Sequence, residues 1–86
     1  MRDIKIVIDK IVNEIPDEWP YAFMLKSEIL GIRYQACYTA PEMHKQLWKN
    51  LSFELSRAMP DVKEFPWARK VSNIIRNKEE DNEKLV

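Results

Sequence analysis

Prolines and a glycine divide this sequence into short pieces, each long enough for one helix. Five prolines and one glycine are spread over 86 residues, and no stretch between them has the composition of a flexible linker. Proline disrupts a helix interior and glycine favours a helix C-terminus, so these residues indicate helix boundaries. Within the pieces, apolar residues recur at the 3.6-residue period of an amphipathic helix. We expect an all-α fold, a compact single domain of four to five short helices over residues 1–78, followed by an acidic, frayed tail over 79–86.

The first piece, residues 4–15, is compatible with a helix and with a short strand. Its apolar residues follow Asp3, a good N-cap residue, and stay on one helical face for about three turns, longer than most strands. Many of them are β-branched, however, and the first isoleucines also alternate as in a strand. We favour the helix and expect Pro16 to end it.

Local signals predict where the other helices begin and end. Asp17 is a candidate N-cap for a second helix, which Gly31 would end in the left-handed conformation that suits glycine. Residues 32–39 would then form a short third segment. The stretch 39–42 has the pattern of a capping box for a fourth helix, and a last helix would begin near Pro66.

The residues that carry catalysis or bind metals are few. Cys37 and His44 are the only soft ligands, whereas a structural zinc site takes four. Pro41 lies between them and interrupts any helix that could pair them, so we expect Cys37 to be buried and His44 to be a surface residue. One glycine is too few for a phosphate-binding loop. The sequence therefore predicts a protein that is not an enzyme, with no metal and no cofactor.

The charge balance and the single cysteine indicate a cytoplasmic protein without a membrane segment. Fourteen basic residues offset fourteen acidic ones, so no overall field attracts nucleic acid or a membrane surface. A single cysteine cannot form an internal disulfide, and the N-terminus has no signal-like pattern. No apolar run approaches the roughly 20 residues that cross a bilayer.

The last predicted helix carries unbalanced basic charge. No acidic residue occurs from Phe65 to Lys78, a stretch with four bases. We define the basic ridge as the polar residues on this helix: Arg69, Lys70, Asn73 and Arg76. Such a ridge suits phosphates or an acidic protein surface. Bases near a helix C-terminus also complement the helix dipole, and that structural explanation stays open.

The stretch from Phe23 to Pro41 resembles a helix-turn-helix. Ser27 precedes Gly31 by four residues, the spacing of a helix followed by a glycine-containing turn. The segment 32–49 would then lie on duplex DNA, with side chains that suit phosphates and base edges: Arg33, Gln35, Tyr38, Lys45 and Lys49.

Two aromatic residues lie beside the apolar stripe of the predicted fourth helix. Trp48 is next to the stripe and Phe53 is off it. If exposed, they would suit a protein interface or the seam of a homodimer, whereas a broad stripe would carry both into a core.

Two functions fit these features. The first is a small, non-catalytic, DNA-binding regulator that uses residues 32–49 and the basic ridge. The alternative is a protein-binding adaptor or inhibitor, of the size that phages and mobile elements often encode, whose ridge and aromatic residues contact an acidic protein. The basic middle of the chain favours DNA, and the zero net charge favours a protein partner.

Overall fold

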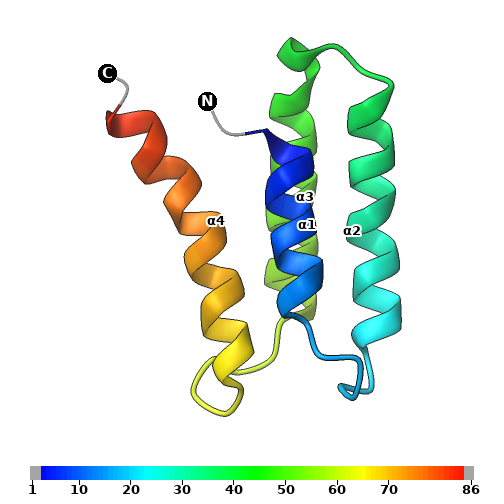
Figure 1. Ribbon diagram of the computed structural model, residues 1–86, viewed down its shortest axis with the longest axis vertical. Helices are drawn as coiled ribbons and strands as arrows, with labels where there is room; N and C mark the ends of the chain where they lie inside the picture. Colours follow the sequence, from blue (N-terminus) through cyan, green and yellow to red (C-terminus); the bar gives the residue numbers. More distant parts are fainter. Residues whose placement is uncertain (1–2, 85–86) are drawn as a thin grey trace.

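Four α-helices and one short 3₁₀ turn account for most of the chain. The computed structural model describes residues 3–84, with side chains as far as Arg76. The elements are α1 (Ile4–Glu14), α2 (Ala22–Cys37), η1 (Pro41–Met43), α3 (His44–Ala58) and α4 (Pro66–Lys84). Consecutive helices alternate in direction, and α2 and α4 lie on opposite sides of the overlapping α1 and α3 (Figure 1). The expected all-α single domain is confirmed, and no strand occurs among residues 3–84.

Helix α1 is the centre of the bundle. Asp3 caps it by accepting a hydrogen bond from the backbone N–H of Lys5 at 2.9 Å, as the sequence predicts. Helix α1 packs against both α2 and α4, so its apolar stripe is fully buried. The stripe consists of Ile4, Val7, Ile8 and Ile11. The first piece is therefore a helix, and not the short strand that its alternating isoleucines also allowed.

The rest of the core comes from the α2–α3 hairpin and from α4. Helix α2 contributes Leu25 and Ile29, and α3 contributes Leu51 and Leu55. The predicted stripe of the last helix also faces inward, with Val71 buried. Within the described residues, no helix is long and apolar enough to cross a membrane.

The turn expected at Gly31 does not exist. Helix α2 continues through this position to Cys37, and Gly31 has no positive φ angle. The helix continues because apolar residues on both sides of the glycine belong to one buried face: Leu25, Ile29, Ile32 and Ala36. The separate segment 32–39 and the helix-turn-helix built on Gly31 were therefore wrong.

Two predicted helix caps are also wrong. Asp17 does not cap α2, which begins after Tyr21, and its carboxylate instead accepts a hydrogen bond from Lys26 Nζ at 2.6 Å. Thr39 does not form a capping box, because its hydroxyl donates back to the carbonyl oxygen of Gln35 at 3.0 Å. Pro41 does start a helical turn, but this turn is the 3₁₀ element that leads into α3.

The backbone of α4 is helical as far as Lys84. The predicted boundary between the domain and its tail at residue 78 stays a prediction. The acidic tail expected over 79–86 falls on residues whose side chains lie outside the described part of the chain.

Candidate functional site

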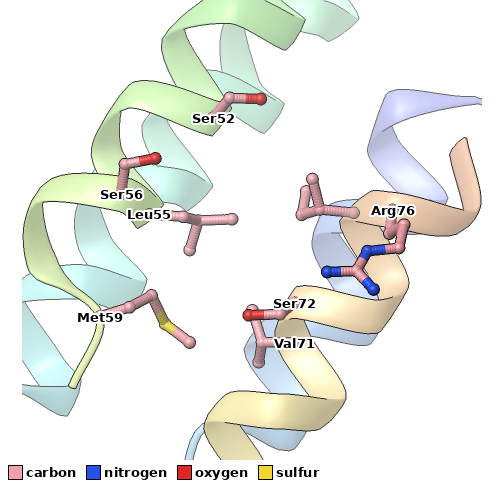
Figure 2. Close-up of a pocket in the computed structure, with 8 residues that line it drawn as sticks. Ser52, Leu55, Ser56, Met59, Val71, Ser72 and Arg76 are labelled. Atoms are coloured by element: carbon pink, nitrogen blue, oxygen red, sulfur yellow. The ribbon is translucent and has the colours of Figure 1, made fainter. Parts of the chain in front are cut away.

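A groove with an apolar floor and a polar rim separates α3 from α4. Helix α4 packs mainly on α1 and is tilted away from α3, which leaves a cavity of about 330 Å³ between the two helices. Leu55 of α3 and Met59, which follows the last residue of α3, point toward α4, and Val71 lies across from them (Figure 2). Ile75 completes the apolar floor, and the rim is polar: Ser52, Ser56, Ser72 and Arg76. We call this feature the α3/α4 groove.

One basic residue, Arg76, lines the α3/α4 groove, and three others continue its two edges by helical spacing. On α4, Arg69 and Arg76 are seven residues apart and share the helix edge that carries Ser72. On α3, Lys45 and Lys49 continue the row of Ser52 and Ser56 at spacings of three and four residues. All four bases are exposed. None forms an ion pair with a described residue.

The predicted basic ridge divides into two sides. Lys70 is about 100° around α4 from Arg69, on the side away from the groove edge. Asn73 is exposed beside Arg69 and carries no charge. Helical spacing therefore places Arg69 and Arg76 on the groove side of α4 and Lys70 on the other side.

The residues expected to read DNA from α2 do not join this group. Arg33 donates to Asp9 of α1 through Nε at 2.8 Å and Nη2 at 3.3 Å. This hydrogen bond, together with the attraction of the carboxylate, raises the pKa of Arg33 above its ordinary value. Gln35 and Tyr38 are exposed near the end of α2, which lies on the opposite side of the bundle from α4 (Figure 1).

The two aromatic residues predicted at an interface have different environments. Trp48 is 6% exposed and packs in the core, so its expected place at a surface seam is wrong. The apolar stripe of α3 is broad enough to include it. Phe53 is 64% exposed, with the guanidinium of Arg57 at 5.9 Å from its ring centre.

Cys37 and His44 are placed at the joint between α2 and α3. Cys37 is exposed, contrary to the expected burial, because it lies on the outer side of the last turn of α2. His44 is partly buried, and its Nε2 is 3.2 Å from the carbonyl oxygen of Ala36 and 3.3 Å from that of Thr39. An N–H at this atom donates to both oxygens, so the imidazole links the start of α3 to the end of α2 and to the loop that follows it. No group of three or more potential metal ligands occurs among the described residues.

An aromatic cluster at the other end of the bundle was not foreseen. The rings of Trp19 and Trp67 are 4.9 Å apart between centres, with Tyr21 at 5.5 Å from Trp19 and Phe65 at 6.2 Å from Trp67. These residues line an apolar pocket of about 550 Å³ between two loops. Trp19 and Trp67 are far apart in the sequence, so only their abundance could have suggested a cluster. The tilted rings pack on each other and hold the two loops together.

A comparison of the chain with protein-family models, with curated protein sequences and with solved structures finds no significant match.

Proposed function

We propose that this protein is a non-catalytic, protein-binding adaptor or inhibitor that holds an acidic, amphipathic segment of its partner in the α3/α4 groove. The observation that carries this proposal is the combination of an apolar floor with basic edges. Leu55, Met59 and Val71 provide the floor. Arg76 lies on the rim, and Arg69 precedes it by two turns on the same side of α4.

The two parts of the groove would contribute different terms to binding. Leu55 and Val71 are already buried, so the apolar surface that a partner removes from water is mainly that of the partly buried Met59 and Ile75, and its burial supplies affinity. The exposed bases of the edges attract carboxylates and orient the segment, which raises the association rate more than the affinity. An amphipathic helix with acidic flanks satisfies both requirements, because its apolar face and its charges lie on separate sides. We place this interaction in the cytoplasm, where a free, exposed thiol such as Cys37 stays reduced.

Duplex DNA is the second candidate partner. The specific observation in its favour is that five exposed bases of α3 and α4 form no ion pair with a described residue: Lys45, Lys49, Arg69, Lys70 and Arg76. Against it, α2 has no turn at Gly31, and Arg33 is already held by Asp9. The phosphates of DNA also make no favourable contact with the apolar floor of the groove, so we favour a protein partner.

Charge-neutral variants of α4 test the proposal. The double variant Arg69→Gln/Arg76→Gln removes one basic edge of the groove, and Lys70→Gln removes a charge from the other side of the same helix. Tagged forms of the wild type and of both variants are recovered from the native cells, and the bound proteins are identified by mass spectrometry. We expect one acidic protein to be recovered in equal amounts with the wild type and with Lys70→Gln. The amount recovered with the double variant should be at least tenfold lower.

A titration with duplex DNA at two salt concentrations tests the second candidate. Counterion release would give a steep loss of affinity with salt, and each lost phosphate contact would lower the slope by about one unit. Sub-micromolar DNA binding with such a slope, together with no acidic protein on the wild type, would replace the proposed protein partner with DNA.

A further inference from the structure

Helix α2 is apolar on its outer face as well as on its buried face. Its solvent side carries a stripe at spacings of three and four residues: Phe23, Ser27, Leu30, Tyr34 and Tyr38. Phe23 is 85% exposed, Tyr34 is 65% exposed and Tyr38 is 73% exposed. A surface helix normally presents polar residues on the side opposite the core. The outer stripe of α2 is therefore an unpartnered interaction face.

We propose that this outer stripe is the seam through which two copies of the chain form a dimer. At roughly 200 Å² for a whole aromatic side chain, the exposed parts of the three rings amount to on the order of 450 Å² per copy. Leu30 and Met24 on α2 and Phe53 on α3 are also exposed and extend this surface. If all six side chains are covered in both copies, the dimer buries at most about 1,500 Å², within the range of stable protein interfaces.

The size of the stripe residues favours an antiparallel pairing of the two α2 helices. If the two-fold axis passes between Leu30 and Gly31, Phe23 of one copy lies opposite Tyr38 of the other, and small Ser27 lies opposite large Tyr34. Tyr34 then packs beside a small side chain, as in well-packed interfaces, and the rings of Phe23 and Tyr38 pack on each other at the two ends of the seam. Gly31, next to the axis, has no side chain to keep the helices apart, and the space around it is open.

The charges on one flank of the stripe also suit a second copy, whereas the other flank carries the exposed carboxylate of Glu28. The stripe itself carries no charged residue. Two bases that flank it on α2 are already paired within the chain, Lys26 with Asp17 and Arg33 with Asp9. Two copies of the stripe can therefore meet without burying an unpaired base from that flank. None of the residues that line the α3/α4 groove belongs to this seam, so the dimer and the groove can be tested separately.

Sedimentation equilibrium of the full chain tests the seam, with a matched pair of charge insertions. Leu30→Lys places two like charges at the centre of the proposed interface, and Ile6→Lys makes the same change at another exposed apolar residue, on α1. We expect a wild-type dimer with a dissociation constant in the micromolar range, unchanged by Ile6→Lys and raised at least tenfold by Leu30→Lys. Circular dichroism confirms that each variant is folded.

Disulfide trapping tests the direction of the pairing. Phe23→Cys and Tyr38→Cys are each made in a Cys37→Ser background and mixed under mild oxidation. The antiparallel seam predicts mainly the mixed disulfide between the two variants. A strict monomer at millimolar concentration, or equal effects of Leu30→Lys and Ile6→Lys, would overturn the proposed seam. A majority of disulfides between identical variants would overturn its antiparallel arrangement.

Discussion

At Gly31, packing over several turns outweighs a local helix-ending signal. The residue lies in the middle of α2 with an ordinary helical φ angle, and an added Cβ would meet no atom within 4 Å. Gly31→Ala should therefore raise the free energy of unfolding by about 0.5–1 kcal/mol, because alanine loses less backbone entropy on folding. Urea denaturation in dilute solution, where the chain is monomeric, measures this change. Destabilisation by alanine would show that the residue adopts the turn conformation after all.

Leu51 shows the opposite case, a residue whose role the sequence predicts well. Its place on the stripe of α3 predicts burial, and the side chain is fully buried. Leu51→Ala should lower the free energy of unfolding by about 2–5 kcal/mol, because it leaves a cavity in the core. Ser52→Ala, its exposed neighbour, should change the free energy by no more than about 0.5 kcal/mol in the same urea titration. Similar losses for both would mean that α3 presents a different face to the core.

At the scale of the helices, the stripes could be predicted and several of the ends could not. The stripes that include Val7, Leu51 and Val71 all face the core, because burial of apolar surface dominates folding. Asp17 and Thr39 have the right chemistry for caps, but both bond to other groups that are available only in the folded chain. A cap depends on one hydrogen bond, so a competing partner is enough to move a helix end.

The basic edge of α4 should not be required for the fold. Arg69 and Arg76 are exposed and form no ion pair with a described residue, so their charges have no structural partner to lose. Arg69→Gln and Arg76→Gln should each change the free energy of unfolding by no more than about 0.5 kcal/mol, since glutamine has a similar helix propensity. Thermal unfolding followed by circular dichroism checks this. A larger loss of stability would mean that the two arginines support the helix rather than a partner.

At the scale of the whole molecule, the sequence predicts the charges of the candidate site but not its shape. The absence of acidic residues around Arg69 is a local property that the sequence displays directly. The groove depends on the tilt of α4 away from α3, which no local pattern encodes. The outer stripe of α2 could not be predicted either. The expected helix end at Gly31 placed Phe23 and Tyr34 on different helices, whereas α2 in fact continues to Cys37.

Site-specific photo-crosslinking tests most directly whether the α3/α4 groove binds a protein. A photo-reactive amino acid replaces Ser56 on the rim of the groove, or Lys10 on the exposed side of α1 as the control, in native cells. We predict that the Ser56 position forms one dominant adduct that protease removes and nuclease does not. The adduct should persist with Lys70→Gln and disappear with Arg69→Gln/Arg76→Gln. A nuclease-sensitive adduct, or equal adducts from both positions, would contradict the proposed function.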